Sequence, residues 1–233
     1  MIKFLDWDTK FFSFKVAQLT ANKLYVLDFK KKLKLLKKMK IKLLQYKCNI
    51  NDLKNINAAQ KNNFKYVDLR IQYKKKIKLN IDKKKYLISI AQKKDISTLK
   101  KKFATRFNFT RYYTDDNFKK NKILKFYKNW IERSVKGQFD NYTLLMKEKN
   151  KIIGFCTLTE RSNDTVIIGL VSVVKSQNNY GLNLIKGVEN FLYLKGFKKL
   201  YVVTQGRNHQ AQKLYDKCFF KIDKVECYYH LWL

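Results

Sequence analysis

The segment from Ile167 to Phe220 constrains the fold more than any other part of the chain. It contains an apolar strand, a short polar loop, an amphipathic helix, a second strand and a second helix. The apolar run from Ile167 to Val174 is typical of a strand that is buried on both faces. The order predicts a βαβα unit, and the N–H groups of the loop before its first helix are suited to hold an anion.

The sequence contains signals for the boundaries of both helices in this unit. In the first, apolar residues recur at helical spacing, and Gly196 stands where a glycine commonly ends a helix. The second strand covers Leu200–Val203, and Asn208 precedes the second helix. The inner stripe of this helix comprises Ala211, Leu214, Tyr215 and Cys218. Tyr215 therefore carries a hydroxyl on an otherwise apolar helix face.

Residues 1–80 predict a smaller N-terminal α/β unit, joined by a linker over Lys74–Lys85. Asp28 is the predicted N-cap of a helix over Phe29–Lys40, with Leu33, Leu35, Leu36 and Met39 on its apolar side. Asn51 is predicted to cap a second helix that ends near Lys61. The predicted strands are Lys23–Leu27, Ile41–Cys48 and Phe64–Tyr73.

Residues 81–233 predict a larger second domain. Tyr86–Ile90 is a predicted strand, and helices are predicted from Lys94 or Asp95 to Phe103 and over Phe118–Val135, with an extended loop between them. Two tightly connected strands, Tyr142–Met146 and Lys151–Leu158, lead into Ile167–Val174 as an antiparallel meander. Val225–Leu233 is the predicted final strand. The fold class is therefore α/β (α+β), with a mixed central sheet.

The formal charge of +34 raises the possibility of a nucleic-acid partner. Lysine is spread over nearly every segment, however, while proline is absent and glycine occurs seven times. Lysine, asparagine and isoleucine have A/T-rich codons, so genome bias explains the charge better than a polyanion partner does. A lysine-covered surface still attracts anionic substrates.

The cysteines and histidines have no metal-ligand spacing, so we expect no metal site. Apolar runs are short, which argues against a membrane span, and the N-terminus has no apolar signal region. These features favour a cytoplasmic protein. The sequence leaves open whether the chain forms a homodimer.

Three segments resemble the GCN5-related N-acetyltransferases, specifically the enzymes that acetylate TDP-fucosamine and related TDP-4-amino-4,6-dideoxy sugars. The first is Val202 to Cys218, which contains Thr-Gln-x-x-Asn. The second is Leu5 to Phe14, similar to the Trp-Asp-x-x-Phe-Phe-Gly-Phe opening of these enzymes. The third comprises Arg106-Phe107 and Trp130 to Gly137. Together these segments span nearly the whole chain in the expected order.

The resemblance implies that the Val171–Val174 strand diverges from the Tyr201–Val203 strand, leaving a slot for acetyl-coenzyme A. Backbone groups of Val171 and Val173 would bind the pantetheine arm, which Asn208 would also reach. The loop residues Gln177, Asn178, Asn179, Gly181 and Leu182 would hold the pyrophosphate. This loop departs from the glycine-rich pattern of the family, because only Gly181 is kept. Phe219-Phe220 replaces the usual Gly-Phe.

By the same resemblance, Tyr215 would be the general acid that protonates the departing thiolate. The alternatives for single residues are structural: Asn208 as a helix cap only, Tyr215 as a core residue, and the aromatic residues of Leu5 to Phe14 as core. The sequence does not identify a base for the acceptor amine; Glu132, Asp115, Asp116 and Glu160 are candidates, and each is also explained as a surface charge. Arg106 and Arg111 are candidates to pair with a nucleotide pyrophosphate.

The leading hypothesis is an acetyl-coenzyme A-dependent N-acetyltransferase that acts on a nucleotide-linked amino sugar for surface-polysaccharide synthesis, by direct attack in a ternary complex. A protein or small-molecule amine is the alternative acceptor, although the positive charge argues against a polyamine. The remaining alternatives are a basic nucleic-acid-binding protein and an acetyltransferase-like fold that has lost its activity.

Overall fold

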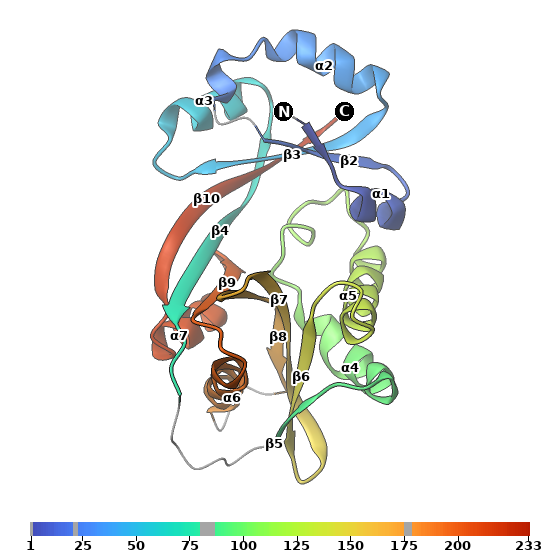
Figure 1. The fold of residues 1–233 in the computed structure, drawn as a ribbon. Coiled ribbons are helices and arrows are strands. Elements are labelled where there is room, and N and C mark those ends of the chain that lie inside the picture. The colour runs from blue at the N-terminus through green and yellow to red at the C-terminus, as the bar shows by residue number, and fades with distance from the viewer. Residues whose placement is uncertain (1, 21–22, 80–86, 175–178) are drawn as a thin grey trace.

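The computed structural model describes residues 2–20, 23–79, 87–174 and 179–233. They form a ten-stranded mixed sheet in the order β1-β2-β3-β10-β4-β9-β8-β7-β6-β5 (Figure 1). The pairs β2–β3 and β8–β9 are parallel, and the other neighbouring pairs are antiparallel. The predicted α/β class with a mixed sheet is confirmed.

The N-terminal elements largely follow the sequence pattern, and their bounds are β1 (Ile2–Phe4), α1 (Asp6–Phe12), β2 (Lys15–Leu19), α2 (Phe29–Lys38), β3 (Ile41–Asn49), α3 (Leu53–Lys61) and β4 (Lys65–Lys76). Asp28 caps α2 as predicted, because its carboxylate accepts from Lys31 N at 3.1 Å. Three details differ. Lys23–Leu27 is not a strand but contains a 3₁₀ turn, η1 (Leu24–Val26), whose Leu24 N–H donates to the Asn55 side chain. The α3 cap is Asp52 rather than Asn51.

The third difference is Leu35, which is half exposed although it belongs to the predicted apolar side of α2. Leu36 is fully buried and supplies the contact of this helix with the sheet. The lysines of α2 therefore share their solvent side with one leucine.

The second half begins with β5 (Leu87–Ile90), so the start of the predicted strand at Tyr86 and residues 80–85 of the predicted linker lie outside the described residues. The start of the linker was predicted wrongly, because Lys74–Lys76 continue β4 and pair with β9. Its other elements are η2 (Lys93–Asp95), α4 (Ile96–Phe103), η3 (Ala104–Arg106), α5 (Lys120–Val135), β6 (Tyr142–Glu148), β7 (Lys151–Ser162), β8 (Thr165–Val173), α6 (Tyr180–Leu194), β9 (Lys199–Gln205), α7 (His209–Lys217) and β10 (Lys221–Trp232). The predicted meander and βαβα unit are therefore present. Gly196 follows α6 with φ +84°, a conformation that favours glycine.

The last strand, β10, lies between β3 and β4. It pairs with β3 from Glu226 to Trp232 and with β4 from Lys221 to His230, both antiparallel. The end of the chain therefore completes the sheet of the N-terminal elements, and β4 and β10 run together towards α7 (Figure 1).

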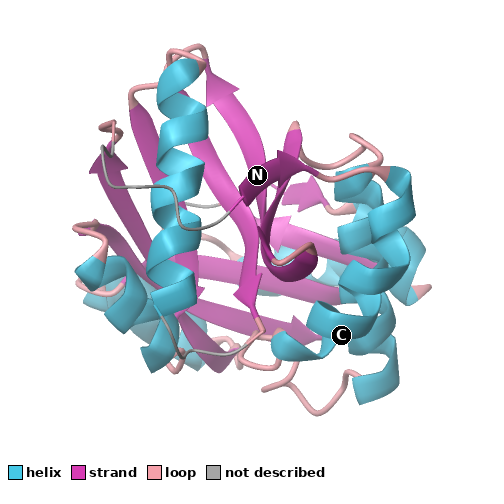
Figure 2. Ribbon diagram, turned by 90° about the horizontal axis from the view of Figure 1, so that it is seen from below, coloured by secondary structure: helices cyan, strands magenta, loops and turns pink. Residues whose placement is uncertain are grey.

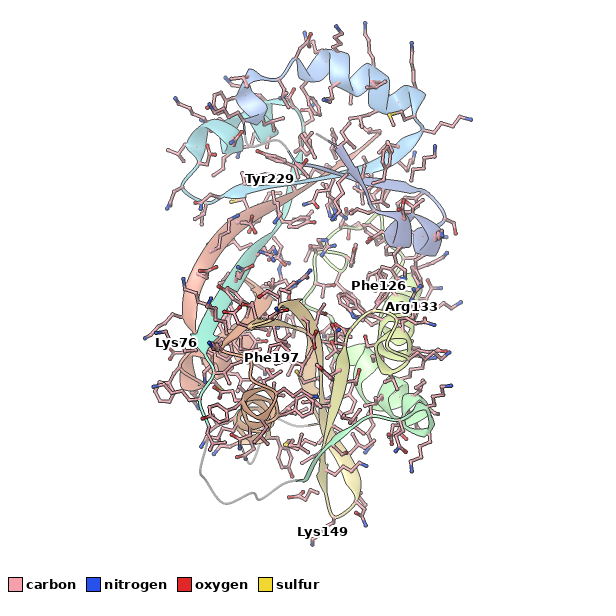
Figure 3. All side chains as sticks on the ribbon, viewed as in Figure 1. Lys76, Phe126, Arg133, Lys149, Phe197 and Tyr229 are labelled. Carbon is pink, nitrogen blue, oxygen red and sulfur yellow. The ribbon has the colours of Figure 1, made fainter. Side chains whose placement is uncertain are left out.

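Helices cover both faces of the sheet (Figure 2). On one face, α6 and α7 pack on β4 and β6–β9 through a core that includes Leu184, Val188, Leu200 and Tyr215. On the other, α4 and α5 pack through an aromatic core around Phe126, which Figure 3 labels. A third core, which contains Leu36, Tyr46 and Tyr229, holds α2 and α3. In the described ranges, no helix is long and apolar enough to cross a bilayer.

Candidate active site

The strands β8 and β9 pair only along their first halves. Their parallel register runs from Thr165 opposite Lys199 to Ile168 opposite Val202, and no further pairs follow within the described residues. Both strands nevertheless continue, to Val173 and Gln205. The edges of Gly169–Val173 and Val203–Gln205 that face each other are therefore separated. We call this gap the slot; its position agrees with the divergence that the resemblance to the acetyltransferases implies.

The backbone orientation of β8 follows from its pairing with β7. Val174 N donates to Ile153 O at 2.8 Å, which marks a hydrogen-bonded pair. Antiparallel pairs alternate, so Ser172 opposite Phe155 is also of the bonded type, whereas Val173 and Val171 are not. The N–H and C=O groups of Val171 and Val173 therefore point away from β7, into the slot. The free edge of a strand offers N–H and C=O groups for pairing, so a ligand that has amide groups fits this edge.

The helix that follows the slot is α6. Asn179 precedes it with φ +54°, a left-handed conformation that asparagine tolerates better than most residues. Gly181 is buried, and a Cβ there would lie 3.0 Å from the Leu214 side chain of α7, so this glycine lets the two helices approach closely. Leu182 packs at the edge of the same core. Gln177 and Asn178 lie outside the described residues.

Asn208 is the N-cap of α7. Its side-chain oxygen accepts from Ala211 N at 3.2 Å, which satisfies one free donor of the first turn. Asn208 is partly exposed, at the turn where β9 enters the helix. The capping role expected from the sequence is therefore present.

Tyr215 of α7 is buried, with 2% of its surface exposed. Its ring packs against Tyr73 of β4 and Phe220, at centroid distances of 5.4 and 5.5 Å. Burial raises the pKa of its phenol well above the usual value, and the neighbouring Cys156 and Cys218 thiols add to this effect. Cys156 is opposite Val171 in the β7–β8 register. Tyr215, Cys156 and Val171 therefore share one core, and the hydroxyl stays protonated.

A polar pocket of about 220 Å³ lies beside the far end of β9. Its wall includes Val203 and Gln205, which follow the last β8–β9 pair. Its floor is the sheet, where Lys47 of β3, Tyr228 of β10 and Asp68 of β4 are directly opposite one another. The pocket therefore joins the slot to the N-terminal elements.

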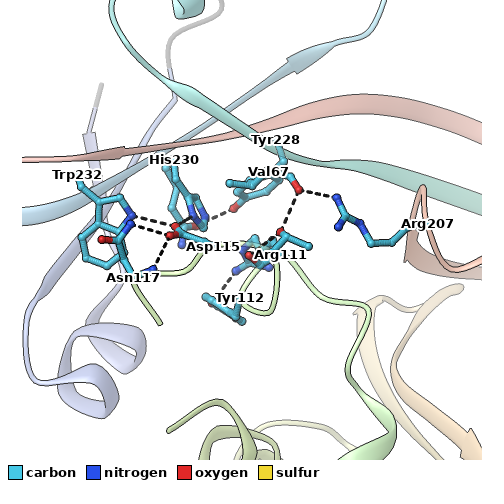
Figure 4. A network of polar contacts seen from close by, with 11 residues as sticks. Val67, Arg111, Tyr112, Asp115, Asn117, Arg207, Tyr228, His230 and Trp232 are labelled. Carbon is cyan, nitrogen blue, oxygen red and sulfur yellow. Dashed lines mark hydrogen bonds and ion pairs between the residues drawn. The ribbon is translucent and has the colours of Figure 1, made fainter. Parts of the chain in front are cut away.

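Three positive side chains line this pocket: Lys47, Arg70 and Arg111. Lys47 and Arg70 form ion pairs with Glu226, at 3.2 and 2.7 Å. Arg111, from the loop after η3, is different. Its Nη2 donates to Tyr112 Oη at 2.7 Å, and its guanidinium stacks on the rings of Tyr112 and Tyr228 (Figure 4). In the described part of the chain, Arg111 has no carboxylate within ion-pair distance, and its buried Nε has no hydrogen-bond partner.

Other buried polar atoms near the same floor have no hydrogen-bond partner within the described ranges. They are Asp68 Oδ2, Gln45 Nε2 and His230 Nε2. Gln45 accepts from Tyr228 Oη at 2.7 Å and is opposite His230 in the β3–β10 register. Buried polar groups that lack partners are costly, so their gathering here indicates a site that a polar ligand completes.

The base candidates named from the sequence do not line this pocket. Asp115 accepts from Trp232 Nε1 and Asn117 and contacts His230 Nδ1 at 2.6 Å (Figure 4). Burial alone would raise the pKa of Asp115, but these hydrogen bonds outweigh it and lower the pKa to about 2. Glu132 pairs with Lys100 and Lys136 on the helix surface, and Asp116 is exposed.

Glu160 accepts from Tyr142 Oη at an exposed position. Arg106 donates to the Val174 carbonyl at the end of β8, so it borders the slot rather than the pocket.

The aromatic residues of the Leu5–Phe14 segment belong to the core. Trp7 lies 4.3 Å from the Phe126 ring, and Phe12 is buried against Phe118. The carboxylate of the segment is nonetheless connected to the pocket, because Asp8 accepts from the same Tyr112 hydroxyl that Arg111 contacts.

Sequence reasoning missed the pocket residues Lys47, Asp68 and Arg70. One signal was present: Asp68, Arg70 and Gln72 alternate along β4 and therefore share one face. The sequence alone does not bring this face together with β3 and β10.

Comparison with known proteins agrees with this geometry. Residues 105–220, which include both edges of the slot, match the acetyltransferase (GNAT) family model. The fold is similar to a GCN5-related N-acetyltransferase from Sphaerobacter thermophilus, with a TM-score of 0.62 and 10% identity over 99% of this chain and 76% of that one. It is also similar to a functionally unknown protein from Staphylococcus epidermidis, with a TM-score of 0.64 and 12% identity over 93% and 83% of the two chains.

The chain thus contains a domain of the GNAT family. A more particular relative is a dTDP-fucosamine acetyltransferase of Escherichia coli O6:H1, which is 30% identical over 131 residues. The match covers 54% of each protein, so the chain spans about half the length of this relative.

Proposed function

We propose that the protein is an N-acetyltransferase that transfers the acetyl group of acetyl-coenzyme A to the amine of a nucleotide-linked amino-deoxy sugar. The observation that carries this proposal is the slot between β8 and β9, with the Val171 and Val173 backbone groups on one edge. The GNAT domain match supports the same chemistry.

In this proposal, the pantetheine amides of acetyl-coenzyme A replace the missing β9 partner along Val171 and Val173. The first N–H groups of α6, next to Gly181 and Leu182, face the pyrophosphate, and the helix dipole favours that negative charge. The loop residues Gln177, Asn178 and Asn179 join this contact, and Asn208 contacts the pantetheine from the start of α7.

Tyr215 acts as the general acid. When the acceptor nitrogen attacks the thioester carbon, a C–N bond forms and the C–S bond breaks. The thiolate that leaves takes the phenolic proton of Tyr215, which burial keeps in place at working pH. The acceptor nitrogen loses two protons in total, one before the attack and one after it.

A nucleotide-linked sugar is the acceptor class that the polar pocket fits best. Among the described residues, Arg111 has no carboxylate within ion-pair distance, and a guanidinium of this kind suits a phosphate group. The Escherichia coli relative is a dTDP-fucosamine acetyltransferase, which is in accord with this class of acceptor.

The test is a transfer assay with acetyl-coenzyme A and TDP-4-amino-4,6-dideoxygalactose, followed by mass spectrometry of the sugar nucleotide and by release of free coenzyme A. We expect one acetyl group on the product and one thiol released per product. TDP-fucose, which has a hydroxyl in place of the amine, is the matched control and should remain unmodified. Binding of acetyl-coenzyme A without transfer to this amine would redirect the proposal to another acceptor.

A further inference from the structure

The pocket contains a carboxylate whose surroundings differ from those of the other acidic groups described above. Asp68 is 3% exposed and lies on β4, opposite Tyr228. Its Oδ1 accepts from Leu69 N at 2.8 Å and lies 3.5 Å from Arg207 Nε. Its Oδ2 is buried and has no hydrogen-bond partner among the residues that the structure describes.

The contacts of Asp68 described above involve Oδ1 and not Oδ2. Arg207 is itself fixed, because its Nη2 donates to Val67 O at 3.0 Å (Figure 4). Thr114 donates to the same carbonyl from the loop that contains Arg111. Leu69 N and Arg207 therefore hold Oδ1, while Oδ2 has no hydrogen-bond partner among the described residues.

The protonation behaviour of Asp68 suits a proton acceptor. Burial raises its pKa, and the Arg207 charge opposes this rise. A carboxylate with a raised pKa is a better base than an exposed one, because its affinity for a proton is closer to that of the amine it must serve.

The position of Asp68 relative to the slot also fits. The pocket that it lines includes Val203, the first β9 residue beyond the last β8–β9 pair. An amine in this pocket can therefore approach the thioester from the side opposite to α7, whose Tyr215 packs on the other face of the sheet.

We infer that Asp68 is the catalytic residue that binds the acceptor ammonium through Oδ2 and takes its first proton. The neutral amine then attacks the thioester, and Asp68 returns the proton to water. This inference rests on the proposed function for the attack itself, but the ammonium contact is a binding property that is measured separately.

The first experiment compares the affinities of two sugar nucleotides by calorimetry, in wild type and Asp68→Asn. Wild type should bind TDP-4-amino-4,6-dideoxygalactose about 10-fold or more tightly than TDP-fucose, since a hydrogen bond to a charged group has this magnitude. In Asp68→Asn the ratio should fall to near one. Asp223→Asn is the matched control, because Asp223 is held by Lys74 and Gln72 outside the pocket.

The second experiment measures kcat/KM for acetyl transfer. Asp68→Asn should lose about 10²- to 10⁴-fold, the usual contribution of a general base, while its affinity for acetyl-coenzyme A stays unchanged. The inference would be overturned if wild type and Asp68→Asn had the same ratio of affinities for the two sugar nucleotides. It would also be overturned if wild type bound neither nucleotide. Failure of wild type to bind acetyl-coenzyme A, with the discrimination intact, would instead refute the proposed function and leave the ammonium contact standing.

Discussion

The role of Tyr215 leads to a prediction with separate outcomes for catalysis and stability. Tyr215→Phe removes only the hydroxyl and keeps the ring contacts with Tyr73 and Phe220. If the hydroxyl protonates the leaving thiolate, kcat should fall by about 10²- to 10⁴-fold, which corresponds to about 3–5 kcal/mol of lost transition-state stabilisation.

The stability of the same variant should change little. No hydrogen bond to the hydroxyl is formed by the described residues, so its removal should alter the free energy of unfolding by less than about 1 kcal/mol. Affinity for acetyl-coenzyme A should also be kept, because the proton moves only after the C–S bond begins to break.

The assay is release of free thiol under saturating substrates, with urea unfolding of the same preparations. Tyr73→Phe is the control, since Tyr73 is a buried neighbour that the proposal gives no catalytic role. An unchanged kcat in Tyr215→Phe would show that the Tyr215 hydroxyl does not protonate the leaving thiolate. A parallel loss of activity in Tyr73→Phe would mean that the loss comes from packing.

Four further predictions concern the slot, the helices that border it and acid stability. Val171→Pro removes an N–H that points into the slot and should weaken acetyl-coenzyme A binding by about 3- to 10-fold in calorimetry. Ser172→Pro instead removes an N–H that pairs with β7, and it should unfold the protein. Gly181→Val must displace Leu214 and should reduce the same affinity more than it lowers the melting temperature; unchanged affinity would place the pyrophosphate elsewhere. Lys75→Met removes the ion pair with Glu189 that joins β4 to α6 and the hydrogen bond that Lys75 Nζ donates to Cys218 O, so urea unfolding should show a loss of about 1–3 kcal/mol. Burial lowers the pKa of His230 below its usual 6.5, so the unfolded chain binds the proton more tightly than the folded chain does. The free energy of unfolding should therefore fall as the pH drops below about 6.5. His230→Asn should abolish this loss of stability in thermal melts measured from about pH 7 to pH 5.

The sequence predicted the elements that depend on local pattern. The helix over His209–Lys217 and the buried position of Tyr215 followed from apolar spacing, and Asp28 was a correct cap because its side chain bonds three residues ahead. Asn51 was wrong as a cap because Asp52, an equally suitable residue, is adjacent.

Elements set by distant contacts were not predictable in the same way. The position of β10 between β3 and β4 pairs residues such as Tyr228 and Lys47, which are far apart in the chain. The polar pocket depends on this pairing, so Asp68 could be recognised as a polar strand residue but not as part of a site. Leu35 fits the apolar pattern of α2, yet the sheet beneath this helix covers Leu36 instead.

The central claim is that the divergence of β8 and β9 forms the binding site of acetyl-coenzyme A. The most direct measurement is calorimetric titration of the purified protein with acetyl-coenzyme A at moderate salt, where nonspecific attraction to the positive surface is screened. We expect saturable binding at one site per chain, with a lower affinity in Val171→Pro. Absence of binding at about millimolar ligand, near the weak limit of a specific complex, would contradict it.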